Sequence, residues 1–300
     1  MFKKTILYYS VLLFAVLTLA ACKTDLSSEA DKKAIENDSQ IQSYIANLKL
    51  NVQKTASGLY YNIKPGGGTQ KPKAGEEVGV YYTISRLDGL GIDSTLKSQQ
   101  KADYFPYGVG YKLFGIEEGL SLMNIGDKAT LLLPSSLAFG ATSYDVLPAY
   151  SVIRVDIELI SSKNEELQIT DYIAKNKLKV TETTTTGLRF IPISFAAGGG
   201  TALKAGQSVT VNYTGSMLRD VRSVKDGKYV YTAKFDSGTY TMTLGSGSSI
   251  AGFEEGVAKM KVGDKAQFIF PSAIGYKERG SGTIPPYTPL LFEVEVTKAL

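Results

Sequence analysis

Hydrophobic and polar residues alternate in several short segments of the chain. In residues 290–296, and again in 153–159, every second position is apolar and most positions between them are charged. A period of two predicts strands that turn one face towards a core. Ahead of these segments, residues 116–123 and 253–260 carry apolar side chains at positions i, i+4 and i+7, which predicts one short helix with a single buried stripe. The pattern predicts an α+β fold, in which a curved antiparallel sheet wraps around one short helix.

The same order of segments occurs twice, because the chain repeats itself. Gly126-Asp127-Lys128-Ala129 returns as Gly263-Asp264-Lys265-Ala266. A period this long indicates a duplicated domain, since the units of solenoid proteins are much shorter. The expected parts are a tether with a short helix (22–50), a first domain (51–162), a linker helix (163–180) and a second domain (181–300).

The connections around the predicted strands repeat as well. Similar segments at 41–47 and 169–175 predict a short helix ahead of each domain. Glycine runs at 66–68 and 198–200 are expected to form hairpin turns, since no Lys-Ser/Thr follows them to complete a phosphate-binding loop.

The first 21 residues differ from the rest of the chain. Lys3 and Lys4 precede an apolar run at 6–17, and the segment ends in Leu19-Ala20-Ala21-Cys22. This order is typical of an export signal and is too short for a membrane span. The cysteine after Leu-Ala-Ala resembles the lipobox of bacterial lipoproteins, which implies cleavage before Cys22 and acylation of that residue. We expect a lipid anchor in the bacterial cell envelope, at the periplasmic face of the outer membrane; an ordinary N-terminal anchor helix is the alternative.

Composition removes several classes of function. The chain has 33 Lys plus Arg against 29 Asp plus Glu, a net charge of +4, so we expect no nucleic-acid partner. Histidine is absent and there is one cysteine. Nucleophilic catalysis that needs histidine, His-ligated metal sites and internal disulfides are therefore excluded. We expect neither a metal nor a cofactor.

A series of short motifs in the second repeat carries a family resemblance. They include Val211-Asn212-Tyr213-Thr214-Gly215, Lys234-Phe235-Asp236-Ser237, Gly252-Phe253-Glu254-Glu255-Gly256 and Ile284-Pro285-Pro286. The order and spacing of these motifs, which extend over nearly all of residues 187–300, resemble those of the FKBP-type peptidyl-prolyl isomerases. The first repeat is similar more distantly, through Val80-Tyr81-Tyr82-Thr83 and Ile92-Asp93-Ser94. The resemblance implies two tandem FKBP-like domains.

The resemblance also implies a site and its partners. X-Pro segments of exported polypeptides would enter an apolar cleft, and rotation about the X-Pro bond breaks no covalent bond. The residues that match the family's cleft are Tyr213, Phe235, Asp236, Phe253, Tyr276 and Phe292 as catalytic candidates, with Tyr240, Ile250 and Ile284 as substrate-binding candidates.

Two departures from the family pattern stand out. The segment after Asp236 is short, so the arginine that accompanies this carboxylate in the family has no match. Residues 217–233 are longer than usual and predict an extended hairpin. Asp236 has a second interpretation, as an ordinary turn residue before Ser237-Gly238, and the aromatic residues have one as plain core.

The first repeat lacks much of this aromatic set. Ile92, Ile116, Phe139 and Val155 stand where the second repeat has Phe235, Phe253, Tyr276 and Phe292, and the position of Tyr240 falls near Asp103 and Tyr104. Smaller aliphatic residues predict a shallower, degenerate pocket with weak activity or none. Two functions remain open. One is an isomerase that assists the folding of exported proteins, active mainly in the second domain; the other is a non-catalytic peptide-binding, chaperone or scaffold lipoprotein.

Overall fold

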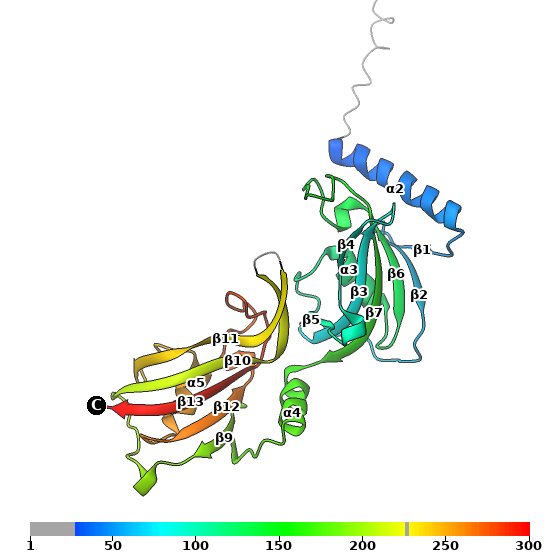
Figure 1. Ribbon diagram of the computed structural model, residues 1–300. Coiled ribbons are helices and arrows are strands. Elements are labelled where there is room, and N and C mark those ends of the chain that lie inside the picture. The colour runs from blue at the N-terminus through cyan, green and yellow to red at the C-terminus, as the bar shows by residue number, and fades with distance from the viewer. Residues whose placement is uncertain (1–27, 226–227) are drawn as a thin grey trace, which may run out of the picture.

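Two antiparallel sheets, each with one helix in its concavity, form most of the protein (Figure 1). The computed structural model describes residues 28–225 and 228–300. The predicted export signal and Cys22 lie outside the described residues. No helix within the described part of the chain is long and apolar enough to cross a membrane.

The first sheet and helix α3 (Phe114–Leu122) form what we call the N-terminal domain. Its strands, in sheet order, are β1 (Gln53–Lys54), β2 (Tyr60–Lys64), β6 (Lys128–Leu133), β7 (Ile153–Lys163), β3 (Glu77–Arg86) and β4 (Gly91–Ser94), with β5 (Asp103–Pro106) also paired to β3.

The second sheet and helix α5 (Ala251–Ala258) form the C-terminal domain. Its strands, in sheet order, are β11 (Lys228–Thr243), β10 (Ser208–Lys225), β13 (Leu290–Ala299), β12 (Lys265–Phe270), β9 (Arg189–Ser194) and β8 (Glu182–Thr183). The strands follow one another in the same way as in the first sheet, with β11 in the place of both β4 and β5. The α+β prediction and the duplication are confirmed.

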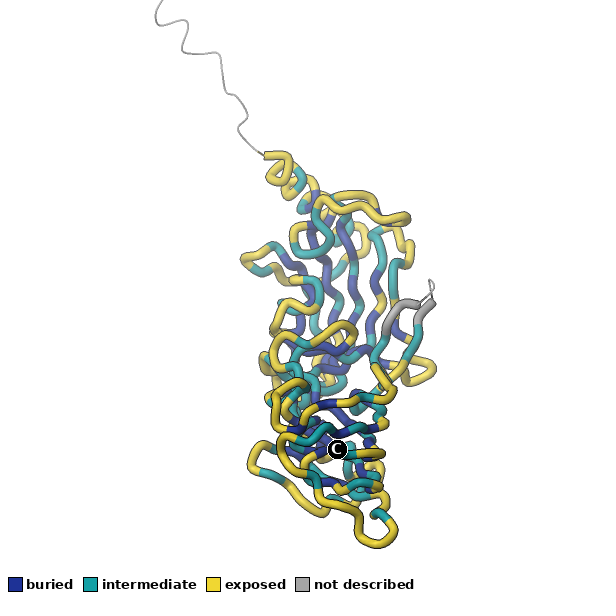
Figure 2. Tube along the Cα trace, turned by 90° about the vertical axis from the view of Figure 1, so that its left-hand side faces the viewer, coloured by how far each residue is buried: buried dark blue, intermediate teal, exposed yellow. Residues whose placement is uncertain are grey.

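The predicted stripe on each central helix is buried. Ile116, Leu120 and Met123 are at most 5% exposed, as are Phe253, Val257 and Met260. Buried positions follow the strands while the connections are exposed (Figure 2). Each domain therefore has its own core between helix and sheet.

Glycines on the central helices allow this close packing. A Cβ at Gly256 would lie 2.6 Å from the Phe268 ring, and one at Gly119 would lie 2.4 Å from Leu131. Larger residues at these positions would force the helix away from the sheet. The Glu-Glu-Gly motif that both repeats share thus marks the contact of helix with strand.

The helices ahead of the domains pack on the other face of each sheet. Helix α2 (Glu29–Leu48) places Ile41 in a small core with Tyr60 and Leu132, and α4 (Glu165–Lys175) places Ile169 beside Ile269. Helix α2 is much longer than the predicted 41–47, because a capping box between Ser28 and Asp31 starts it earlier.

The glycine runs do not form hairpin turns, so that prediction is wrong. The runs lie between β2 and β3 and between β9 and β10, and these strands are not neighbours in their sheets. The chain crosses there to another part of the sheet. Gly66 packs against the backbone of Gly126, where a Cβ would lie 1.9 Å from the carbonyl oxygen, and its N–H donates to Asp127 at 2.7 Å.

The extended hairpin predicted over residues 217–233 is present. Strands β10 and β11 stay paired from Val221↔Thr232 outward to Lys225↔Lys228. This arm reaches across to the N-terminal domain, beside β5 (Figure 1). The guanidinium of Arg219 lies 2.8 Å from Glu77 and above the Tyr104 ring at 4.2 Å. The two domains are thus joined by α4 and, independently, by the arm.

Glu77 makes this junction depend on pH. Burial raises its pKa from 4.5 to about 7, against the opposing charges of Arg219 and Lys163. A folded-state pKa above the unfolded value means that the folded state binds the proton more tightly. The stability that the protonated carboxyl contributes is therefore complete below pH 4.5 and is lost as pH rises through 7.

We predict that Glu77→Gln, which resembles the protonated form, gains stability relative to the wild type as pH rises over that range. A shift of this size corresponds to about 3 kcal/mol between the two ends. Thermal unfolding of both proteins across the range measures the difference, with the exposed Glu278→Gln as a control. Parallel pH profiles for Glu77→Gln and wild type would contradict the assignment.

Candidate functional site

A cavity of about 160 Å³ opens between the sheet and helix of the C-terminal domain. It brings together eight of the nine predicted site residues, and adds Ser249, which the sequence did not single out. Ile284 is not among the lining residues and is buried in the adjoining core. The lining consists of Tyr213, Phe235, Asp236, Tyr240, Ser249, Ile250, Phe253, Tyr276 and Phe292.

Phe253 forms the floor of this cavity. It stands in the first turn of α5 and is 4% exposed. Its ring meets those of Tyr213, Tyr240 and Phe292 edge to face, with centroids 5.8, 6.3 and 5.0 Å away. Edge-to-face contacts of this kind hold rings in defined orientations. Plain core packing accounts for Phe253 and Phe292, but not for the half-buried rings of Tyr213 and Tyr240, which face an open cavity.

A β-bulge explains why two adjacent residues of one strand face the same cavity. Gly215 pairs with Asp236 but the next residue, Ser216, pairs with Lys234, so Phe235 is the extra residue on β11. Regular alternation would send Phe235 and Asp236 to opposite faces. The interpretation of Asp236 as a turn residue is wrong, because β11 continues through it to Thr243.

Asp236 is exposed at the rim and is hydrogen-bonded to Tyr213. The Tyr213 hydroxyl donates to Oδ2 at 2.6 Å, and the backbone N–H of Ser237 donates to Oδ1 at 2.8 Å. The bond to the carboxylate raises the pKa of Tyr213 to about 12. No basic side chain of the described residues pairs with Asp236, in line with the missing arginine.

Two donors at the cavity are available to a ligand. Ile250 precedes α5, and within residues 28–225 and 228–300 no group accepts a hydrogen bond from its N–H. The hydroxyl of Tyr276, in the loop after the 3₁₀ turn Ser272–Ile274, also has no hydrogen-bond partner in the described structure. Burial raises the pKa of Tyr276, so this hydroxyl stays a donor.

The N-terminal domain also has a cavity at the equivalent place, of about 140 Å³. Its volume is close to that of the C-terminal cavity, so the aliphatic replacements have not closed it. The lining is Val80, Tyr82, Ile84, Asp93, Phe105, Lys112, Leu113, Ile116 and Phe139. The Tyr–Asp pair is retained, since the Tyr82 hydroxyl donates to Asp93 at 2.8 Å.

Charge is what distinguishes the N-terminal cavity. Val80 pairs with Asp103 as Val211 pairs with Tyr240, so Asp103 takes the place of that ring. Asp103 is 4% exposed and forms an ion pair of 2.7 Å with Lys112, whose ammonium lies 4.8 Å from the centroid of the Phe105 ring. Lys112 was not predicted from the sequence, although it stands three residues before Gly115 as Ser249 stands three before Gly252, and this spacing indicates its place at the cavity.

An arginine from the other domain completes the N-terminal site. Arg222, on the arm, donates through Nη1 to the Tyr82 hydroxyl at 2.6 Å and through Nη2 to Oδ1 of Asp93 at 2.6 Å. Nη2 also donates to the Ser94 carbonyl at 3.0 Å. No local signal in the sequence links residues so far apart, and Arg222 was not predicted.

A larger hollow of about 310 Å³ lies on the N-terminal sheet. Its lining is mainly polar and charged, and includes an ion pair between Lys97 and Glu158. The sequence predicts an apolar, water-poor cleft, and the lining of the C-terminal cavity matches that prediction better than this polar lining does.

Comparison with known proteins gives consistent matches. The family described as FKBP-type peptidyl-prolyl cis-trans isomerase matches residues 68–160 and 199–297. Mouse peptidyl-prolyl cis-trans isomerase FKBP9 is 25% identical over 271 residues, which cover 89% of this chain and 42% of that protein. FKBP-type isomerase FkpA of Aeromonas hydrophila is 37% identical over 136 residues, which cover 45% of this chain and 50% of that protein.

Among solved structures, FkpA from Escherichia coli is 22% identical with a TM-score of 0.38, covering 54% of this chain and 73% of that one. The chain spans about half the length of the curated relatives named above.

The Tyr213–Asp236 bond predicts an unusual titration. At about pH 11 an ordinary tyrosine is largely ionised, whereas Tyr213, with a pKa of about 12, stays protonated. Asp236→Asn removes the negative charge and should lower the pKa of Tyr213 towards 10. Ring carbon shifts in ¹³C-tyrosine-labelled protein, assigned with Tyr213→Phe, measure both values. Ionisation of Tyr213 at the ordinary pH in the wild type would contradict the prediction.

Proposed function

The chain belongs to the FKBP-type peptidyl-prolyl cis-trans isomerases, and we propose that its C-terminal domain catalyses rotation about X-Pro bonds in exported polypeptides. One observation carries this proposal: an open cavity walled by aromatic rings, with two unused hydrogen-bond donors at its edge.

The physical basis is the loss of amide resonance during rotation. An X-Pro bond faces a barrier of about 18–20 kcal/mol and rotates in about 10–100 s uncatalysed. When the amide twists, its dipole shrinks, so a water-poor, apolar cavity stabilises the twisted form relative to water. The rings of Phe235, Phe253 and Phe292 provide that environment, and no nucleophile is required.

The unused donors hold the peptide while the bond turns. The Ile250 N–H is suited to bind a carbonyl of the peptide, and the Tyr276 hydroxyl is suited to bind a second acceptor. Asp236 fixes the Tyr213 ring by accepting its hydroxyl, which keeps the cavity wall in place. These contacts position the substrate and transfer no proton.

For the N-terminal domain we propose a structural or peptide-docking role with weak turnover or none. The ion pair between the partly exposed Lys112 and the buried Asp103 introduces full charges where the other domain has Ser249 and Tyr240. Charges of this kind favour the planar, more polar amide and oppose catalysis. This domain is also the observation that favours the second candidate for the whole chain, a non-catalytic peptide-binding or scaffold protein.

We also propose that the protein is a lipoprotein of the bacterial cell envelope, held at the periplasmic face of the outer membrane. The support is the sequence Leu19-Ala20-Ala21-Cys22 after a short apolar run. Acyl chains on Cys22 would anchor the chain without a membrane span.

Cys22→Ala tests the anchor. The variant should lose incorporation of labelled fatty acid and should leave the membrane fraction, because the chain has one cysteine and so no second thiol to acylate. Thr24→Ala is the matched control and should keep both properties. A Cys22→Ala protein that still carries fatty acid would show that the anchor is elsewhere.

Phe235→Ile tests the catalytic proposal in the full chain. It places in the C-terminal cavity the residue that the N-terminal repeat has there, Ile92. We expect kcat/KM for X-Pro isomerisation of a short peptide to fall about tenfold or more, because the ring wall is opened to water. Exchange NMR on the peptide measures the rate.

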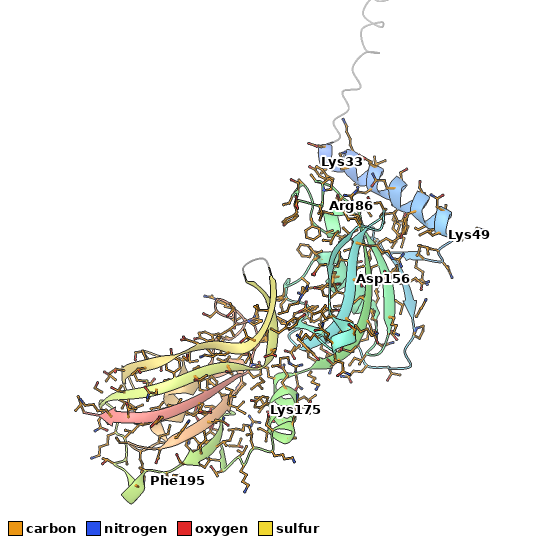
Figure 3. All side chains as sticks on the ribbon, viewed as in Figure 1. Lys33, Lys49, Arg86, Asp156, Lys175 and Phe195 are labelled. Atoms are coloured by element: carbon orange, nitrogen blue, oxygen red, sulfur yellow. The ribbon has the colours of Figure 1, made fainter. Side chains whose placement is uncertain are left out.

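The control for Phe235→Ile is Phe195→Ile. Phe195 is 75% exposed at the end of the domain away from the arm (Figure 3), and its loss should leave the rate unchanged. If the folded wild-type protein does not accelerate isomerisation, the catalytic proposal is wrong and the non-catalytic peptide-binding function remains.

A further inference from the structure

The two domains carry the same Tyr–Asp pair at the same position of the sheet. On β3 and β4, Ile84, two residues after Tyr82, pairs with Asp93; on β10 and β11, Gly215, two residues after Tyr213, pairs with Asp236. The hydroxyl-to-carboxylate distances are 2.8 and 2.6 Å. Each pair lines the cavity of its own domain. The contacts of the Tyr82–Asp93 pair therefore indicate what the Tyr213–Asp236 pair can bind.

In the N-terminal domain this pair binds a guanidinium. Arg222 reaches both oxygens of Asp93, at 2.6 and 3.1 Å, and the Tyr82 hydroxyl at 2.6 Å. The side chain of Arg222 is 7% exposed, and it comes from a strand outside that domain. A two-pronged contact between guanidinium and carboxylate is among the stronger polar interactions in proteins. The pair is therefore a cation site.

In the C-terminal domain, no basic side chain of the described residues occupies the same site. Asp236 is exposed and accepts bonds from Tyr213 and from the N–H of Ser237. An ionised carboxylate has about four acceptor positions, so two remain. Lys234, two residues earlier on β11, forms no ion pair with Asp236 within the described residues. The arginine that the family pattern leads one to expect is missing from this domain.

We propose that the cation at this site is supplied by the substrate: the C-terminal cleft prefers X-Pro segments with a lysine or arginine next to the proline. The inference rests on the proposed function. Asp236 and the ring of Phe235 line one cavity. A proline ring among the aromatic residues therefore places a neighbouring side chain at the rim, where it takes the position that Arg222 holds in the other domain.

Long-range electrostatic attraction by the protein as a whole does not explain a preference for cationic peptides. The chain has a net charge of +4, which repels cationic peptides at long range. A preference for them therefore reports a local contact. Because the site is partly exposed, we expect a moderate gain in kcat/KM of about three- to tenfold, reduced by added salt.

The experiment compares matched peptides with the full chain. Each pair of short peptides has lysine or norleucine directly before, or directly after, the proline; norleucine keeps the aliphatic stem and lacks the charge. Exchange NMR measures kcat/KM for each peptide. We expect the lysine peptide to exceed its norleucine partner in at least one placement, and the ratio to fall to about one in Asp236→Asn.

Glu295→Gln is the control for net charge. It removes an exposed carboxylate from β13 outside the cavity and should keep the ratio of the wild type. A wild-type ratio of one in both placements overturns the inference while leaving the isomerase proposal intact. So does a ratio that persists in Asp236→Asn.

The proposed isomerase activity can also fail while the inferred preference for a lysine or arginine beside the proline holds. If no peptide is isomerised, the proposed activity fails, and the same peptides are then compared by binding. Tighter binding of the lysine peptide that depends on Asp236 supports the inference for a binding cleft, and equal binding overturns it.

Discussion

The contact between helix α5 and strand β12 is the constraint on which the C-terminal cavity depends. Gly252 and Gly256 lie against the rings of Phe270 and Phe268, and a Cβ on either glycine would come within 2.6 Å of a ring. Because the helix can sit this low in the sheet, Phe253 reaches the floor of the cavity from the same helix. The wall rings then pack on Phe253 edge to face. If the helix lay farther from the sheet, the rings of the cavity wall would lose their contact with Phe253.

The same frame supports two different cavities. In the N-terminal domain Gly115 and Gly119 make the equivalent contacts with Leu133 and Leu131, and the cavity is nearly as large. What separates the domains is the lining: Lys112, paired with the buried Asp103, lies at the N-terminal cavity, whereas Ser249 and a larger set of aromatic rings line the C-terminal one. Backbone packing thus preserves the hollow, while a few side chains decide whether its interior is apolar.

The hairpin that carries the arm connects the two domains and contributes to both of their sites. Its arginines satisfy the acidic groups of the N-terminal domain, Arg219 at Glu77 and Arg222 at Asp93. The bulge at Phe235 lies on the same β10–β11 hairpin as the arm, so one long hairpin both shapes the C-terminal cavity and holds the other domain. Arg222 thereby neutralises the Tyr82–Asp93 pair, whereas the part of the chain that the structure describes places no basic side chain on Asp236.

The family resemblance of the motifs implied eight of the nine residues around the cavity. Local pattern was enough to determine the α+β fold, the duplication and the buried helical stripe, because the periods of strands and helices and the spacing of the repeats can be read along the chain. It misjudged the glycine runs and Asp236, since turn residues alone do not reveal which strands become neighbours. The Arg222 contact joins residues 129 apart. Only the docking of distant strands decides such a pair, because its energy depends on a distance in space that no local pattern encodes.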